Sequence, residues 1–221
     1  MSIQEYEFAR FIKLLDGCGC LDYVMLVGSW AEYLYRELGV LKGFDPNIRT
    51  LDIDFLVRNL RKPSEPLGLA AAAREAGYLV ESDRLTSATK IMDRSGLEIE
   101  FLIGKMGAGA ESTLKTNIGV TAQSLWHMDI LARNAMSVSY FSYFDMRVFV
   151  PSPEAYAVHK MVINKERKGK SEKDIRAVIG IWPYLDKDEV ERIIGTLTKK
   201  ERVSVNSFMK TNSLRFKGET G

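Results

Sequence analysis

Two acidic residues interrupt an apolar segment, and this pattern strongly limits how the segment can fold. Residues 51–58 are apolar except at Asp52, Asp54 and the last position. Because successive side chains of a β-strand point to opposite faces, a strand here places Asp52 and Asp54 on one face, roughly 7 Å apart at Cα. Ile53 and Phe55 then point to the other face. The sequence therefore predicts a strand with one apolar face and a pair of carboxylates on the other.

A carboxylate pair of this kind needs neutralisation. Burying a carboxylate in apolar surroundings is costly unless it is paired, and two close carboxylates raise each other's pKa unless a cation lies between them. Mg²⁺ prefers oxygen ligands, and paired carboxylates can hold two ions about 3.5–4 Å apart for phosphoryl chemistry. The alternative is that Asp52 and Asp54 lie on the solvated face of an edge strand.

The segments before this strand favour the interpretation of Asp52 and Asp54 as cation ligands over that of residues on a solvated strand face. Gly28 and Ser29 stand between an apolar run of strand length and a helical pattern, where backbone N–H groups and the helix dipole favour phosphate. Ser29 and Glu32 also fit a capping box, with Ser29 as the N-cap. Arg49 and Thr50 come directly before the acidic pair, and we take Arg49, Thr50 and Gly28-Ser29 as candidate residues for binding a phosphate-bearing cofactor or substrate.

A third carboxylate is expected from a neighbouring strand. Glu98 and Glu100 alternate with apolar residues, so they share one face of a strand. Directly opposed side chains on paired strands lie about 4.5–5.5 Å apart at Cβ. Either glutamate is therefore close enough to complete the site, and a solvated strand face is again the alternative.

Apolar periodicity and turn residues predict the remaining elements. We predict a domain at residues 1–150 and a helical subdomain at 151–221, because Pro151 and Pro153 precede a change to helical patterns. Helices are predicted at residues 3–15, 30–38, 67–76, 154–165, 171–181 and 186–199. Strands are predicted at residues 23–27, 51–58, 78–81, 88–92 and 96–103, followed by a hairpin of 137–141 and 147–150.

Composition and charge exclude few classes of protein. Hydrophobic residues make up 46% of the 221 residues, and the net charge of +2 is too small to indicate nucleic-acid binding. Cys18 and Cys20 are expected to be free thiols, because one residue separates them and no second pair is present. No apolar run approaches about 18 residues, and no signal peptide is visible. We therefore expect no membrane span and a cytoplasmic location.

Together these motifs resemble those of the polymerase-β-like nucleotidyltransferase superfamily. Gly28-Ser29, Asp52-Ile53-Asp54 and Glu98-Ile99-Glu100 match its turn, its acidic pair and its later acidic strand. The string from Arg49 to Asp54 resembles the bacterial branch that includes abortive-infection toxins. Residues 150–160, with Lys173 and Asp174, resemble a little-characterised group of bacterial nucleotidyltransferases. The resemblance covers most of residues 23–180.

The resemblance implies a fold and a chemistry. The fold is α+β, with a mixed central sheet, flanking helices and a helical C-terminal subdomain. The reaction is the transfer of a nucleoside monophosphate from an NTP to an acceptor with release of pyrophosphate. Asp52 and Asp54 would bind Mg²⁺, or Mn²⁺ in its place. Glu100 matches the third carboxylate better than Glu98, although the family usually has aspartate at that position.

The helical segment after Pro153 adds basic candidates. Lys160, Asn164 and Arg167 share a helix face by their spacing, and Lys173 begins the next helix. The resemblance favours Lys160 and Lys173 as ligands of the NTP phosphates, and the alternative is a solvated basic surface. His159 is interpreted as a packing residue. His127 has no partner that the sequence identifies.

Two functions from different classes fit these residues. The first is an active nucleotidyltransferase whose acceptor is RNA, a protein or a small molecule, with action as a toxin as one use of that chemistry. The second is a non-catalytic nucleotide- or RNA-binding module that retains the fold, and Glu100 in place of aspartate favours it.

Overall fold

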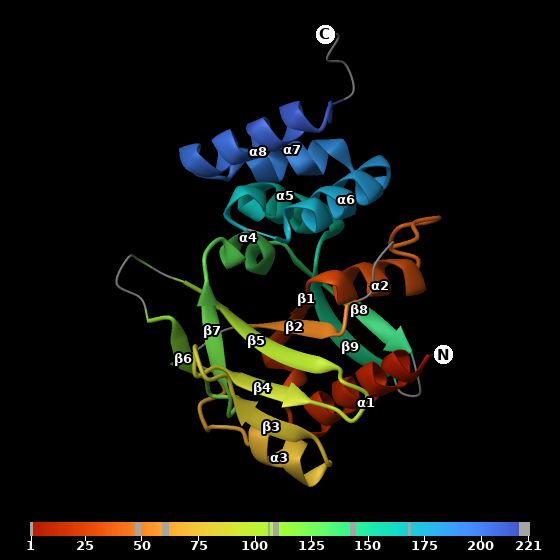
Figure 1. Ribbon diagram of the computed structural model, residues 1–221. Coiled ribbons are helices and arrows are strands. Elements are labelled where there is room, and N and C mark those ends of the chain that lie inside the picture. The colour runs from red at the N-terminus through yellow and green to blue at the C-terminus, as the bar shows by residue number, and fades with distance from the viewer. Residues whose placement is uncertain are drawn as a thin grey trace.

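A mixed β-sheet with helices on both sides forms the centre of the molecule (Figure 1). The computed structural model describes residues 2–46, 50–58, 62–105, 107, 111–141, 145–167 and 169–216. The helices are α1 (Ile3–Gly17), α2 (Ser29–Glu37), α3 (Leu69–Glu75), α4 (Met128–Arg133), α5 (Pro153–Ile163), α6 (Ser171–Ile181), α7 (Lys187–Gly195) and α8 (Lys199–Thr211). The strands are β1 (Val24–Val27), β2 (Asp52–Val57), β3 (Leu79–Ser82), β4 (Thr89–Met92), β5 (Glu98–Gly104), β6 (Thr113–Lys115), β7 (Thr121–Leu125), β8 (Ala135–Phe141) and β9 (Asp145–Pro151).

The strand order places β2 and β5 in the middle of the sheet. Within the described residues the order is β1-β2-β5-β4-β3, and β7 joins β5 with β6 on its outer side. β2 and β5 are parallel, whereas β1 with β2 and β4 with β5 are antiparallel. β5 pairs with β4 through its first residues and with β7 through its last. The predicted α+β fold with a mixed sheet and C-terminal helices is confirmed.

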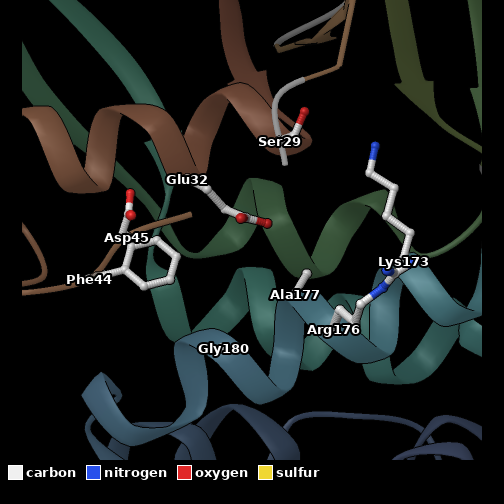
Figure 2. Close-up of a pocket in the computed structure, with 8 residues that line it drawn as sticks. All are labelled: Ser29, Glu32, Phe44, Asp45, Lys173, Arg176, Ala177 and Gly180. Atoms are coloured by element: carbon white, nitrogen blue, oxygen red, sulfur yellow. The ribbon is translucent and has the colours of Figure 1, made fainter. Parts of the chain in front are cut away.

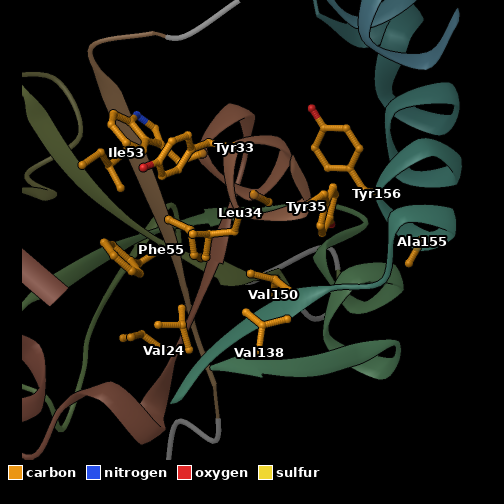
Figure 3. Close-up of a cluster of buried hydrophobic side chains, with 14 of the residues drawn as sticks. Val24, Tyr33, Leu34, Tyr35, Ile53, Phe55, Val138, Val150, Ala155 and Tyr156 are labelled. Carbon is orange, nitrogen blue, oxygen red and sulfur yellow. The ribbon is translucent and has the colours of Figure 1, made fainter. Parts of the chain in front are cut away.

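The alternation predicted for β2 is confirmed by burial. Ile53 and Phe55 are fully buried, while Asp52 and Asp54 are partly exposed. The Phe55 ring stacks on Phe101 of β5 and contacts Phe11 of α1. Figure 3 shows Ile53 and Phe55 in this core beside side chains of α2. One face of the sheet is therefore the main core, and the opposite face carries the acids.

The acidic face of the sheet is apolar at its other end. Leu56 of β2 and Leu102 of β5 pack there with Met128 and Leu131 of α4. Helix α5 packs against α4, α6, α7 and α8, so the C-terminal helices stand over this face (Figure 1).

Helix α5 also contacts α2, on the N-terminal side of the predicted domain boundary. The Tyr35 hydroxyl donates a hydrogen bond of 2.7 Å to the Pro151 carbonyl, and the Tyr156 ring packs edge-on against Tyr35. Figure 3 shows Tyr35 and Tyr156 side by side. The division at residue 150 stays a prediction.

Several elements differ from the predicted ones. β6, β7, α4 and α8 were not predicted, and the single helix expected at 186–199 ends at Gly195. A second helix begins at Lys199 because Thr198 caps it in a capping box with Glu201. No helix of the described residues has the length and apolarity that a bilayer crossing requires.

Candidate functional site

A large cleft lies between the acidic face of the sheet and the C-terminal helices. Its volume is about 630 Å³, which is within the usual range of about 300–1,000 Å³ for ligand sites. The sheet contributes an acidic wall, α5 and α6 a basic wall, and β7 with α4 an apolar wall. The predicted site residues that line it are Gly28, Ser29, Thr50, Asp52, Asp54, Glu100, Lys160 and Lys173. Arg49 lies outside the described residues.

The acids form rows across neighbouring strands. Asp54 of β2 is paired with Glu100 of the parallel strand β5, and Glu100 is paired with Lys90 of the antiparallel strand β4. Directly paired residues project from the same face. Asp52 is paired with Glu98 in the adjacent row. Asp52, Asp54 and Glu100 line the cleft, and Glu98 is not among its described lining residues. The choice of Glu100 as the third carboxylate stays a prediction.

Asp54 is the carboxyl group most affected by this arrangement. Its pKa is raised to about 6, first by burial and then by the negative charges of Glu100 and Asp52. Lys170 and Arg167 act in the opposite direction but do not offset it. A cluster of like charges of this kind is stabilised by a cation.

Gly28 is required by the close approach of β1 to Asp54. Its φ of 70° is in the left-handed region, and a Cβ atom at this position would lie 2.5 Å from Asp54 Oδ2. Val27 is paired directly with Asp54, which brings the turn after β1 against the carboxylate. A side chain at residue 28 would therefore displace Asp54.

Ser29 does not cap α2, so the predicted capping box is wrong. The N-cap is Gly28, and Ser29 is the first helical residue. Its Oγ lies 2.7 Å from Thr50 Oγ1, while Glu32 is buried and accepts a hydrogen bond from the Tyr156 hydroxyl. The left-handed glycine takes the cap position, and burial against α5 takes Glu32 away from the helix start. Ser29 and Thr50 thus join the start of α2 to the segment before β2.

The residues present fit a divalent cation at Asp52 and Asp54. Both carboxylates are partly buried on one face of β2 and line the cleft. Mg²⁺ is commonly held by one or two carboxylates together with substrate phosphates and water. Among the described residues no three acidic, histidine or cysteine side chains are placed to hold a metal ion together. Glu100 as positioned does not complete a three-carboxylate site.

Glu100 is instead paired with Lys90. The Lys90 Nζ atom lies 3.0 Å from Glu100 Oε1 and 3.4 Å from Glu98 Oε2. The hydrogen bond with Glu100 and the nearby carboxylates raise the pKa of Lys90 above its usual value, so its ammonium group is charged. Sequence reasoning missed this residue, because only the strand order makes β4 the neighbour of β5.

The two predicted phosphate-binding lysines differ in their surroundings. Lys160 Nζ lies 2.8 Å from Asp174 Oδ1 in a buried ion pair, and Arg167 Nη1 lies 3.3 Å from the same oxygen. Lys173 is partly buried, which lowers its pKa, as do Lys160 and Lys170, and Asp52 raises it. Figure 2 shows Lys173 extending from α6 toward the start of α2, where Ser29 lies. Lys173 therefore fits the predicted phosphate-binding role better than Lys160, whose ammonium group is paired with Asp174.

The two histidines differ from each other in burial and partners. His159 is buried in α5 and lines the cleft, and burial, followed by Lys160 and other cations, lowers its pKa to about 3. A neutral, buried imidazole agrees with the packing role predicted for it. His127 Nδ1 lies 2.6 Å from Glu201 Oε1 of α8. That partner was invisible in the sequence because α8 was not predicted.

Sequence reasoning also missed part of the cleft wall. Trp126 and Gln123 lie on or after β7, which the sequence patterns did not predict. Lys170, which was not among the predicted site residues, lines the cleft as well. In the sequence, Tyr156 was one more apolar position of a predicted helix, and nothing marked it as a residue of the cleft.

Comparisons with known proteins give the family of the chain and structures of similar fold. The chain matches the sequence model of a family described as nucleotidyltransferase over residues 6–190. An antigenic nucleotidyltransferase-like protein from Paracoccidioides brasiliensis has a similar fold, with a TM-score of 0.55 and 14% identity over 94% of this chain and 88% of that chain. The solution structure of antibiotic-resistance factor ANT(2'')-Ia matches with a TM-score of 0.44 and 12% identity over 96% and 95% of the two chains. No curated protein matches the chain. The expected relationship to abortive-infection toxins stays a prediction.

Proposed function

The chain belongs to the nucleotidyltransferase family, and we propose that it transfers a nucleoside monophosphate from an NTP to an acceptor and releases pyrophosphate. One observation carries this proposal. The carboxylates of β2, the Ser29 turn and the cationic side chains of α5 and α6 line the same cleft. An acidic wall for a metal ion and a basic wall for phosphates are the two parts that phosphoryl transfer requires.

The triphosphate would lie between Ser29 and the basic wall. Ser29 offers its hydroxyl and the N–H groups of the first turn of α2, where the helix dipole favours anions. Lys173 and Lys170 line the opposite side of the cleft. Lys160 would act mainly through Asp174, which it holds in place. This arrangement orients the phosphates by contacts from two separate elements.

Asp52 and Asp54 would hold Mg²⁺, or Mn²⁺ in its place. A bound divalent ion supplies stabilisation of the negative charge that develops on the phosphoryl oxygens. Gly28 contributes by its lack of a side chain, because any Cβ would collide with Asp54. The chain therefore sets the position of the two carboxylates through the β1–β2 pairing.

The reaction itself is an in-line displacement at the α-phosphorus. A bond forms between the acceptor oxygen and the α-phosphorus, and the bond to the oxygen that bridges to the β-phosphorus breaks with its electron pair. The acceptor hydroxyl proton passes to Glu100 or to water. The α5 and α6 walls orient the phosphates and limit water in the cleft, which favours transfer over hydrolysis.

The acceptor is RNA, a protein or a small molecule. Leu125, Trp126, Met128 and Leu131 form an apolar wall that the triphosphate does not need. We assign this wall to the acceptor or to the base of the NTP.

Transfer of label from α-³²P-labelled NTPs tests the proposal. The purified protein is incubated with each NTP, Mg²⁺ and, separately, cellular RNA, cell lysate and a small-molecule extract. We expect one NTP to label one acceptor, with loss of at least about 100-fold in Asp52→Asn and in Asp54→Asn, since each removes charge that stabilises the transition state. Circular dichroism provides the folding control. Full activity in either folded variant would refute the site.

A second candidate is a nucleotide-binding module without catalysis. The pairing of Glu100 with Lys90 favours it, because it leaves the described residues without a three-carboxylate metal cluster. Calorimetry with each NTP and Mg²⁺ separates the two functions when it is combined with an assay for pyrophosphate. Binding without any pyrophosphate supports the module, and pyrophosphate release that depends on Asp52 excludes it.

A further inference from the structure

Lys90 lies at the far side of the acidic row from Asp54. Its ammonium group contacts Glu100 at 3.0 Å, Glu98 at 3.4 Å and Asp83 at 3.9 Å. The side chains of Lys90 and Glu100 are each 30% exposed. The ammonium group of Lys90 therefore contacts three carboxylates at a position that is partly exposed to water.

Glu100 stands between two cavities. It lines the main cleft together with Asp52 and Asp54, and it also lines a side pocket of about 80 Å³ with Lys90 and Asp83. Its Oε1 is directed to Lys90 in the side pocket. The same side chain is thus placed where it can serve either the cleft or the side pocket.

The energy of the Lys90 contact is small enough to be exchanged. Ion pairs with this degree of exposure contribute little to stability, because water screens them. The positive charge, however, lies one cross-strand step beyond Glu100, which itself is paired with Asp54. A divalent cation at Asp54 must therefore compete with Lys90 for the carboxylate of Glu100. The positive charge of Lys90 also weakens the attraction of the carboxylate cluster for that cation.

We propose that Lys90 is a positioning residue that holds Glu100 away from the divalent-cation site at Asp52 and Asp54, so that Glu100 joins the site only when it leaves Lys90. The inference rests on the proposed function, because it assumes the cation site. Glu100 then has two positions, one at Lys90 and one at the cation site, whereas a fixed three-carboxylate site would hold it in one. The role of Lys90 is to set the affinity for the metal and the position of Glu100, not to contact substrate.

The test is Mn²⁺ binding to the full-length, nucleotide-free protein, measured by electron paramagnetic resonance without turnover. Lys90→Met should bind Mn²⁺ about fivefold more tightly, because one positive charge near the site is removed and Glu100 is released. Lys90→Arg should retain the wild-type affinity. Lys115→Met, at an exposed position of β6, is the matched control for the loss of a surface lysine. Lys90→Gln replaces Lys90→Met as the test variant if the methionine variant does not fold.

A double-mutant cycle separates positioning from simple charge. In the Glu100→Gln background, the gain from Lys90→Met should fall by more than half, because no carboxylate is left to recruit. An undiminished gain would mean that Lys90 acts only through its charge, and it would overturn the positioning role. Unchanged or weaker Mn²⁺ binding by folded Lys90→Met and Lys90→Gln would overturn it as well.

The proposed function and this inference fail separately. If the wild-type protein transfers no nucleotide but Lys90→Met still tightens Mn²⁺ binding through Glu100, the inference stands and the transferase proposal fails. If transfer occurs and the metal affinity of the Lys90 variants is unchanged, the function stands and the inference fails. Loss of Mn²⁺ binding in Asp52→Asn with Asp54→Asn identifies the site that is being measured.

Discussion

At the scale of single residues, Asp54 links the metal site to the stability of the fold. Its pKa of about 6 lies above the ordinary value of 3.8 because the carboxyl group is buried and lies beside Glu100 and Asp52. A raised folded-state pKa favours the protonated form. The favourable contribution is complete below pH 3.8 and is lost as the pH rises through about 6. The metal-free protein therefore carries an unfavourable charge at neutral pH.

Replacing that charge should stabilise the metal-free protein. We expect Asp54→Asn to raise the free energy of unfolding at pH 7.5 in EDTA by on the order of 2 kcal/mol, and by clearly less at pH 5. Urea unfolding at the two pH values measures this. Glu191→Gln, at an exposed position in the middle of α7, is the control for the loss of a surface carboxylate. A less stable Asp54→Asn protein at pH 7.5 would contradict the assigned cause of the pKa shift.

The sequence predicted the residues that depend on strand alternation. Asp52, Asp54 and Glu100 share a face because a strand has a period of two, and the register pairs Asp54 with Glu100. The sequence could not predict Lys90, because its contact depends on β4 lying beside β5. It predicted the wrong N-cap at Ser29, because the local pattern does not contain the close approach of Gly28 to Asp54.

At the scale of elements, α5 and α6 divide their basic residues between stability and binding. Lys160 and Asp174 form a buried pair between the two helices. Lys173, one residue before Asp174, lines the cleft and extends toward the start of α2. The same stretch of sequence thus supplies one structural ion pair and one candidate phosphate ligand.

Substitutions should separate these two roles. Lys160→Met should lower the free energy of unfolding by about 3 kcal/mol, because Asp174 would stay buried with only Arg167 to compensate it. Lys173→Gln should leave stability within about 0.5 kcal/mol and weaken NTP binding about tenfold. Chemical denaturation and calorimetry with the preferred NTP measure the two effects. Equal losses of affinity in both folded variants would contradict the division.

Sequence patterns predicted elements with a clear apolar period better than elements without one. The helices at α1, α2 and α5 to α7 follow apolar spacings of three and four residues. β7 was missed because its sequence Thr-Ala-Gln-Ser-Leu has few apolar residues, and α4 because six residues span fewer than two helical turns. These two elements supply the apolar wall of the cleft, so that wall could not be predicted either.

At the scale of the whole molecule, the cleft exists because α4 covers only part of one sheet face. Leu56 and Leu102 project from the same face of β2 and β5 as Asp54 and Glu100, and they are buried beneath α4. Asp54 and Glu100 lie beyond that cover and face α5 and α6 across the cleft. The predicted boundary at residue 150 would make this a cleft between two domains. The sequence indicated the acidic wall and the basic wall of the cleft but not that they face each other.

A crystal structure with Mg²⁺ and a non-hydrolysable NTP tests the central claim most directly. The claim is that one cleft binds the metal on β2 and the triphosphate between α2 and α6. The predicted result is an ion with carboxylate oxygens of Asp52 and Asp54 at about 2.1 Å, and phosphate oxygens beside Ser29 and Lys173. A nucleotide bound outside this cleft, or an ion held without Asp52 and Asp54, would contradict it.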